Sequence, residues 1–238
     1  LEKKKGLVID IGANIGTYSI PLAKLFKKIK FKTFEIQKTV HNILNKNIKL
    51  NKLKNLNTFN VGLSDKKKSF FDIVPDYKKD KNIGTFSIDK LTRSDNYKVL
   101  NSSNKQLLNI DKLDNYNFKS IILIKIDVEG HELETLKGSK NTLIKNNRPL
   151  IIFEAWKRES LKKKNKKTFQ FLKKLGYKIL VINNNCMAFS KEDYRINFIK
   201  VFIKILQERD KFNPNQGVIY NLRQTCSSLK KYFIRVIK

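Results

Sequence analysis

Short apolar runs alternate with longer amphipathic stretches along most of this chain. The unbroken aliphatic runs are typical of parallel strands that are covered by helices on both faces. In the longer stretches apolar residues recur at helical spacing, as at Val40, Leu44 and Ile48. The alternation predicts an α/β fold with a mostly parallel sheet, in which ligands bind at the carboxyl ends of the strands.

The pattern assigns each predicted element to a range of residues. Strands are predicted at residues 7–11, 31–36, 56–61, 121–127, 150–155, 177–182 and 187–190. Helices are predicted at residues 15–28, 40–50, 131–145 and 159–175. Pro149 cannot continue the third helix, and Gly176 is a typical C-terminal stop for the fourth.

The segment 66–108 breaks this rhythm. It is polar, contains Pro75 and Gly84, and is longer than the usual connection in a compact domain. We therefore predict an excursion that crosses the active face of the sheet. Residues 1–192 are predicted to form one domain, and residues 193–238 a basic C-terminal helix and tail.

The net charge of the chain is extreme. Lys and Arg number 51 against 21 Asp and Glu, which gives a formal charge of +30 and a pI near 10.0. This charge predicts salt-sensitive attraction to polyanions and anionic lipid. Because the lysines are spread over helices, loops and tail alike, they favour a general compositional bias over a dedicated phosphate-binding face. No specific nucleic-acid partner is expected.

The C-terminal sequence "LKKYFIRVIK" is cationic and amphipathic, which predicts peripheral contact with an anionic membrane. No run reaches the ~18 apolar residues of a membrane-spanning helix, and no signal peptide is visible. Cys186 and Cys226 show neither metal-ligand spacing nor a disulfide framework. We expect a cytoplasmic protein with peripheral membrane contact.

The turn after the first strand carries the first chemical signal, in the sequence "DIGANIG". Gly12 allows the backbone to approach a ligand, Asn14 tolerates a left-handed conformation, and Gly16 allows close helix–strand packing. Glu35 ends the second strand about 20 residues later, where an acid can accept the hydroxyls of a ribose. Asp10 adds a carboxylate at the strand end. The site predicted here binds a nucleoside or dinucleotide.

Two features of this turn favour S-adenosylmethionine over NAD. The spacing lacks the middle glycine of G-x-G-x-x-G, and Asp10 would place a negative charge close to a pyrophosphate. S-adenosylmethionine has no phosphate and carries a sulfonium and an ammonium, which suit an acidic strand end. The alternative for Asp10 alone is a carboxylate that caps the turn.

The motifs "VIDIGANIGTYSI", "TFEIQ", "NVGLSD", "ILIKIDVEGHELETLKGS" and "RPLIIFEAW" occur in this order. Together they resemble the FkbM-type methyltransferase family, which belongs to the Rossmann-like class I S-adenosylmethionine-dependent methyltransferases. The resemblance covers about residues 7–190. It implies a seven-stranded sheet flanked by helices, with an antiparallel last strand, and O-methylation of hydroxyls, often on sugars, glycans or specialised metabolites.

The resemblance also implies which residues bind S-adenosylmethionine. Carried onto this sequence, they are Asp10, Gly12, Ala13, Asn14, Gly16, Glu35, Ser64, Asp65 and Asp127. The first turn would surround the methionine part, Glu35 would hold the ribose, and Ser64 with Asp65 would lie by the adenine. The chain departs from the family's usual Phe-Glu-Pro motif, because Ile36 and Gln37 follow Glu35.

A second acidic group is predicted at the same edge of the sheet. Asp127, Glu129 and His131 follow the central strand, and Glu154 ends the next strand along the chain. These four are the candidate catalytic residues, since methyl transfer to an alcohol needs an aligned nucleophile and benefits from a base. The alternatives are a helix cap for Asp127 and a surface hydrogen bond for His131.

Two further questions stay open at this point. Carboxylates suit Mg²⁺, so the sequence does not separate a metal cluster from a metal-free acid–base pair. Besides the O-methyltransferase, a nucleic-acid methyltransferase agrees with the positive charge, but its usual Asn/Asp-Pro-Pro-aromatic motif is absent from this sequence. A nucleotide-binding module without catalysis is the third alternative. The complete acidic set at the strand ends argues against it.

Overall fold

The structure is a computed structural model, and it describes residues 5–75, 86–89, 92, 105–155, 159–182 and 185–190. The predicted C-terminal helix and tail lie outside the described residues, so the proposed domain boundary at residue 192 stays a prediction.

All seven predicted strands form one sheet. They are β1 (Gly6–Ile11), β2 (Ile29–Phe34), β3 (Leu56–Phe59), β7 (Ile121–Ile126), β8 (Leu150–Glu154), β9 (Tyr177–Ile182) and β10 (Asn185–Ser190). The order across the sheet is β3-β2-β1-β7-β8-β10-β9, and β10 runs antiparallel to both of its neighbours. This confirms the predicted fold class, including the antiparallel last strand.

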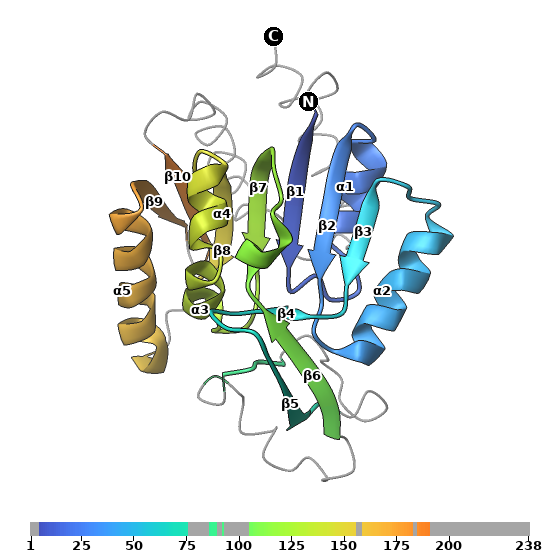
Figure 1. The fold of residues 1–238 in the computed structure, drawn as a ribbon, viewed down its shortest axis with the longest axis horizontal. Helices are drawn as coiled ribbons and strands as arrows, with labels where there is room; N and C mark the ends of the chain where they lie inside the picture. The colour runs from blue at the N-terminus through green and yellow to red at the C-terminus, as the bar shows by residue number, and fades with distance from the viewer. Residues whose placement is uncertain are drawn as a thin grey trace, which may run out of the picture. The chain divides into compact units, whose positions relative to one another are not determined.

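Helices cover both faces of this sheet (Figure 1). Helices α1 (Ser19–Leu25) and α2 (Lys38–Leu50) connect strands on one side of β1, whereas α3 (Glu132–Lys137), α4 (Lys140–Lys145) and α5 (Glu159–Lys174) connect strands on the other. Right-handed crossovers in opposite directions place the two groups on opposite faces. No helix in the described ranges is long and apolar enough to cross a membrane.

The core lies on the central strands. Ile9 and Ile11 of β1, with Ile124 and Ile126 of β7, are all buried to 1% exposure or less. Burying an aliphatic side chain of this size contributes about 1.5–3 kcal/mol relative to leaving it exposed. The continuous apolar runs in the sequence therefore reflect strands with no solvent-facing side.

Two of the predicted helices differ from the structure by more than two residues. The first begins at Ser19 and not at residue 15, because Gly16 has a φ of 94° and belongs to the preceding turn. The predicted helix at 131–145 is two helices, α3 and α4, which meet at Gly138 and Ser139. The carboxylate of Asp114 accepts the backbone N–H groups at the start of α4, so a residue distant in sequence supplies the cap.

The segment predicted as an excursion at 66–108 contains regular strands that the sequence analysis did not assign. Strand β5 (Lys68–Ile73) pairs antiparallel with β6 (Lys105–Asp111), and β6 pairs parallel with β4 (Gly62–Leu63). This small sheet lies beyond the carboxyl ends of the main strands (Figure 1). Its two longer strands, "KSFFDI" in β5 and "KQLLNID" in β6, hold short apolar pairs among polar residues, so they lack the continuous aliphatic runs by which the buried strands were identified.

Candidate active site

The turn after β1 is packed tightly between two neighbouring strands. Gly12 and Ala13 both donate their backbone N–H to the Phe34 carbonyl, each at 3.0 Å. Gly12 has a φ of +76°, and a β-carbon on it would stand 1.8 Å from the Asp127 carbonyl oxygen. Only glycine therefore fits this position, and its backbone joins the ends of β1, β2 and β7.

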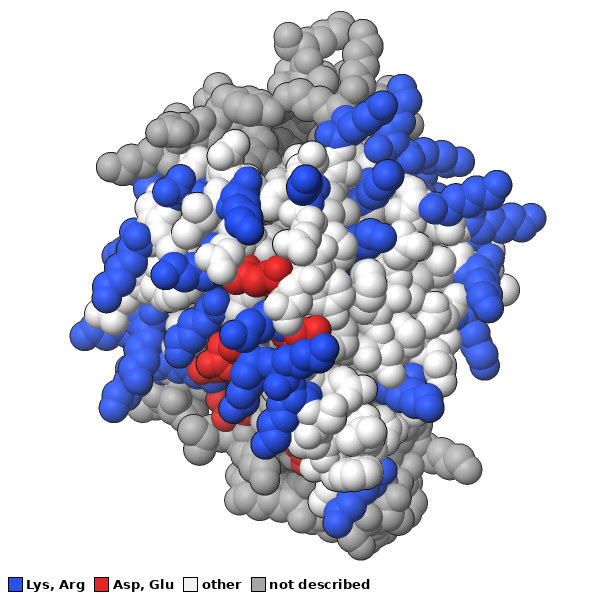
Figure 2. Space-filling view, viewed as in Figure 1, with Lys and Arg blue, Asp and Glu red and all other residues white. Residues whose placement is uncertain are grey.

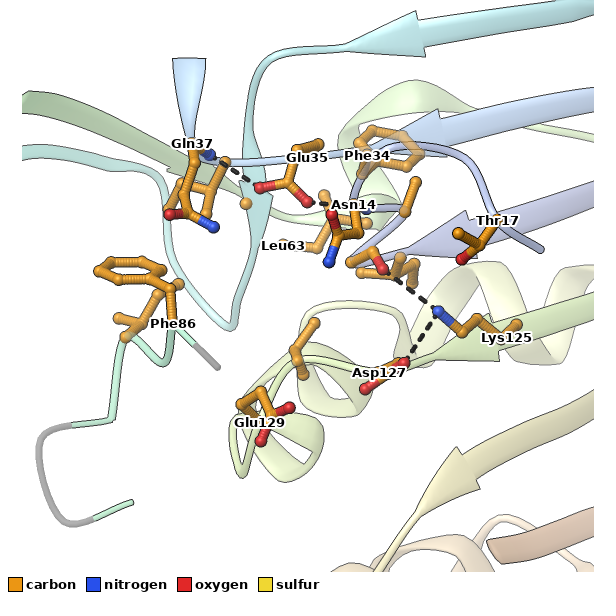
Figure 3. Close-up of a pocket in the computed structure, with 17 residues that line it drawn as sticks. Asn14, Thr17, Phe34, Glu35, Gln37, Leu63, Phe86, Lys125, Asp127 and Glu129 are labelled. Carbon is orange, nitrogen blue, oxygen red and sulfur yellow. Dashed lines mark hydrogen bonds and ion pairs between the residues drawn. The ribbon is translucent and has the colours of Figure 1, made fainter. Parts of the chain in front are cut away.

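A cavity of about 240 Å³ opens beside this turn. Most of its wall comes from the carboxyl ends of β1, β2 and β7, as the topology of an α/β sheet predicts. The lining residues are Ile11, Gly12, Ala13, Asn14, Thr17, Phe34, Glu35, Ile36, Gln37, Gly62, Leu63, Phe86, Ile88, Lys125, Asp127, Val128 and Glu129. Figure 3 shows Phe86 and Lys125 at opposite ends, with Glu35 and Asn14 between them.

Glu35 lies at the middle of the cavity and is held by two backbone bonds. Its Oε2 accepts the N–H of Asn14 at 3.0 Å, and its Oε1 accepts the N–H of Gln37 at 2.9 Å. Burial raises the pKa of this carboxyl, while the two N–H bonds act to lower it. Each carboxylate oxygen keeps a second lone pair, so Glu35 can accept two further hydroxyl bonds.

Asp10 occupies a different place from the one predicted. Its side chain is fully buried and is not part of the cavity wall. Its Oδ1 lies 3.3 Å from Nζ of Lys125, which also lies 3.2 Å from Oδ2 of Asp127 and donates to the Gly12 carbonyl at 3.2 Å. Asp10 therefore does not contact the cavity itself but pairs with Lys125, and the side chains of Lys125 and Asp127 form this part of the wall.

Lys125 is a site residue that the sequence analysis missed. It stands opposite Asp10 in the register of β1 and β7, and two residues before Asp127, so both side chains leave the same face of the strand. The two carboxylates raise the pKa of the Lys125 ammonium despite its burial. A lone cation inside an aliphatic strand was the available signal, because a buried charge requires a partner.

The four catalytic candidates separate into two pairs. Asp127 and Glu129 line the cavity, and the Asp127 side chain is 38% exposed. His131 and Glu154 are not among its lining residues. Helix α3 has His131 at its N-cap position, so Asp127 is not a helix cap. The structure thus brings two of the predicted carboxylates to the cavity beside the turn after β1.

Buried polar contacts engage His131 on both ring nitrogens. Its Nε2 lies 2.9 Å from Oγ of Ser64, and its Nδ1 lies 3.8 Å from Oε2 of Glu134. Burial lowers the pKa of the His131 imidazole. This residue links the loop after β4 to the start of helix α3, and it is not among the residues that line the cavity.

Ser64 and Asp65, predicted beside the adenine, do not line the cavity either. Ser64 is buried and is engaged with His131. The corresponding end of the cavity is apolar and is formed by Ile36, Leu63, Phe86 and Ile88. A β-carbon on Gly16 would meet Ile20 of α1 and Leu44 of α2, so this glycine lets the turn pack closely against two helices. Within the described residues, no group of three or more His, Cys, Asp or Glu side chains could hold a metal ion.

This sheet order, with its antiparallel last strand and a cavity at the β1 and β2 ends, defines a class I S-adenosylmethionine-dependent methyltransferase. Residues 10–179 match the family described as "Methyltransferase FkbM domain". The match spans most of the chain, and the protein belongs to this family. It is an S-adenosylmethionine-dependent methyltransferase.

Solved structures of similar fold were also found. Precorrin-6y C5,15-methyltransferase from Geobacter metallireducens is 13% identical, with a TM-score of 0.47, and the match covers 79% of this chain and 82% of that one. A ribosomal protein L11 methylase from Lactobacillus delbrueckii is 14% identical, with a TM-score of 0.45 and coverage of 78% and 69%. The Streptococcus mutans protein SMU.1697c, in complex with SAH, is 12% identical, with a TM-score of 0.46 and coverage of 78% and 87%. No curated protein matches the sequence.

The cavity's own side chains fit S-adenosylmethionine. Its apolar end at Phe86 and Ile88 suits an adenine ring, and Glu35 in the middle suits a ribose diol. At the other end, the Asp127 carboxylate lines the cavity beside the Lys125 ammonium. A carboxylate there suits the ammonium and sulfonium of the methionine part.

Proposed function

We propose that this methyltransferase transfers a methyl group to a hydroxyl of a sugar, glycan or specialised metabolite. The observation that carries the proposal is the placement of Glu129. This carboxylate lines the cofactor cavity from the turn that directly follows β7. Its backbone is left-handed, with a φ of 50°, a conformation that is uncommon for a non-glycine residue.

Bound S-adenosylmethionine supplies an electrophilic methyl group on a sulfonium. Glu129 would accept the proton of the acceptor hydroxyl as the new O–CH₃ bond forms and the S–CH₃ bond breaks. Asp127 would hold the methionine ammonium and so fix the direction of attack. The products are a methyl ether and S-adenosylhomocysteine, with the proton left on the Glu129 carboxylate.

Glu129 is preferred over the other candidate bases because of position. His131 has its Nε2 at hydrogen-bond distance from Oγ of Ser64 and is absent from the cavity lining. Glu154 ends β8 opposite Asn185 of β10 and is also absent from the lining. Either residue would need a rearrangement to reach an acceptor beside the cofactor.

The nucleic-acid alternative rests on charge. On the face shown in Figure 2, basic side chains lie over both the α5 and the α2 sides, with an uncharged area between them. A nucleic-acid track would need a continuous basic path to the cavity.

We retain peripheral contact with an anionic membrane through the basic C-terminus as a separate proposal. Flotation with anionic vesicles at two salt concentrations tests it, and the absence of flotation at low salt would overturn it.

A labelled-methyl screen tests the proposed acceptor class. We expect transfer from S-adenosylmethionine to one group of hydroxylated acceptors and none to RNA or DNA. Glu129→Gln should reduce kcat by roughly 10²–10⁴-fold, the usual contribution of a general base, while the affinity for S-adenosylhomocysteine is kept. Asp72→Asn, a charge-matched change on β5 outside the cavity lining, should leave kcat near the wild-type value. Transfer to nucleic acid only, or unchanged kcat in Glu129→Gln, would contradict the proposal.

A further inference from the structure

The apolar end of the cavity is formed in part by a segment outside the main sheet. Phe86 and Ile88 line the cavity, and they lie between β5 and β6 in the sequence. Phe86 also packs with Val74 and Leu108 in a small separate core. A wall of this kind must be fixed to the main sheet if it is to hold a ligand against it.

One side chain, Lys164 of α5, makes this connection. Its ammonium pairs with the Asp89 carboxylate, one residue after Ile88, and lies 3.1 Å from Oε2 of Glu134 on α3. The three side chains are only 17–25% exposed. Ion pairs shielded to this extent are screened less by salt than pairs on the open surface. A single ammonium therefore joins the wall segment to α3 and α5.

The same segment contacts the turn that carries Glu129. The Thr92 hydroxyl lies 2.7 Å from the Glu129 carbonyl oxygen, to which it can donate, and 2.6 Å from the Ser87 hydroxyl. Thr92 also packs on Gly130, where a β-carbon would lie 2.4 Å from its Cγ2. The ion pair at Asp89 and the contact of Thr92 with the left-handed turn therefore both hold the described part of this segment.

We propose that Lys164 is a positioning residue of the methyltransferase site. By pairing with Asp89 and Glu134 together, it docks the segment carrying Phe86 and Ile88 onto the main sheet. It thereby sets the apolar end of the cofactor cavity and holds Thr92 over the Glu129 turn. Lys164 contacts the wall segment and not the cavity, so its effect on the cofactor is indirect.

Helix α5 offers a matched control for this inference. Lys163 is the neighbouring lysine on the same helix, but it is exposed, whereas Lys164 is half-buried. Replacing either by Met removes one positive charge and keeps a long apolar stem. Any general effect of lowering the net charge appears in both variants, and an effect of docking appears in Lys164→Met alone.

The test measures two quantities on the full chain. Isothermal titration gives the dissociation constant for S-adenosylhomocysteine, and hydrogen exchange gives the protection of residues 86–92. We expect Lys164→Met to bind about tenfold more weakly, as loss of a shielded charge-assisted bond predicts, with faster exchange in 86–92. Lys163→Met should match the wild-type protein, and Lys164→Arg should keep most of the affinity.

Asp89→Asn removes the partner of Lys164 that lies in the wall segment, so it tests the same ion pair. It also replaces Lys164→Met as the test variant if that protein folds poorly. Its effect should resemble that of Lys164→Met, and the double variant should be no weaker than the weaker single, because both changes break one connection. Equal affinity in Lys164→Met and Lys163→Met, or weaker binding with unchanged exchange in 86–92, would overturn the proposal. Since only the cofactor product is titrated, the outcome is independent of which acceptor the enzyme methylates.

Discussion

The backbone N–H of Asn14 donates to the carboxylate of Glu35 at 3.0 Å, which fixes the turn after β1 to the end of β2. The two residues are 21 positions apart in the sequence. This bond holds Oε2 of Glu35, and the bond from the Gln37 N–H holds Oε1. The Glu35 carboxylate is therefore oriented before any ligand binds.

Removal of this carboxylate should weaken cofactor binding. Glu35→Ala is expected to lose about 10- to 100-fold in affinity for S-adenosylhomocysteine, since charge-assisted hydrogen bonds contribute about 1.5–3 kcal/mol. Isothermal titration measures the loss. An analogue without the ribose hydroxyls should bind the wild-type and variant proteins equally. If the variant lost the same affinity for both ligands, Glu35 would not be the ribose acceptor.

Gly12→Ala should disrupt the site. A β-carbon there would stand 1.8 Å from the Asp127 carbonyl oxygen, and the backbone is left-handed. The strained conformation alone costs of order 1–3 kcal/mol, before the clash is relieved. Urea unfolding should show the loss, with no measurable binding of S-adenosylhomocysteine. The control is Gly6→Ala, where the nearest obstacle is the Ile122 side chain at 2.9 Å and the backbone φ is not left-handed, so the loss should be smaller. An equal loss there would argue against a specific effect at Gly12.

Lys125→Met should be more destabilising alone than together with Asp10→Asn. The single variant leaves the buried Asp10 carboxyl without its partner ammonium, a change that typically costs about 3–5 kcal/mol. The double variant removes both charges and should recover part of that stability in urea unfolding. Additive losses would show that the pair is not energetically coupled.

Asp10→Ala is expected to weaken S-adenosylmethionine binding, because Lys125 and Asp127 would be displaced from their places in the cavity wall.

Glu132 should give the folded state a pH dependence of identifiable sign. Burial raises the pKa of this carboxyl to about 7, from 4.5 in the exposed state. The folded protein therefore binds the proton more tightly than the unfolded chain, so the contribution of Glu132 to stability is greatest below pH 4.5 and is lost as the pH rises through about 7.

The comparison with Glu132→Gln isolates this effect from other titrating groups. Glutamine keeps an acceptor for the Gly130 N–H, which now bonds Oε1 of Glu132 at 3.0 Å. The difference in unfolding free energy between the two proteins should shift in favour of the variant between pH 4.5 and 7, by a few kcal/mol at most. Parallel pH curves for the two proteins would show that Glu132 titrates normally.

Local sequence predicted the main sheet because its strands are buried on both faces. The runs around Ile9 and Ile124 have no polar side, and such runs are legible without any knowledge of neighbours. Strand β5 escaped prediction for the opposite reason. Its Phe70 packs on the small core while Phe71 is 71% exposed, so only pairing with β6 separates it from a polar loop.

In the site, too, some side chains could be predicted from local sequence, whereas others depend on contacts between distant segments. Glu35 and Asp127 were predicted at the cavity because each ends or follows a strand at the ligand-binding edge. Lys125 was missed since its role depends on register with Asp10 of another strand. Phe86 was missed because its position in the cavity wall depends on packing with Val74 and Leu108, which are distant in sequence.

The sequence alone determined the type of sheet, the glycine turn and the acidic strand ends, because apolar period and backbone conformational freedom are local properties. Only the tertiary structure decided that Asp10 lies under the wall, that Lys125 joins it to Asp127, and that His131 and Glu154 stand outside the cavity. These depend on strand register and on packing between distant segments. A charged side chain near a strand end can contact either a ligand or another charged side chain. Its neighbours in space decide between the two, and they are not adjacent in sequence.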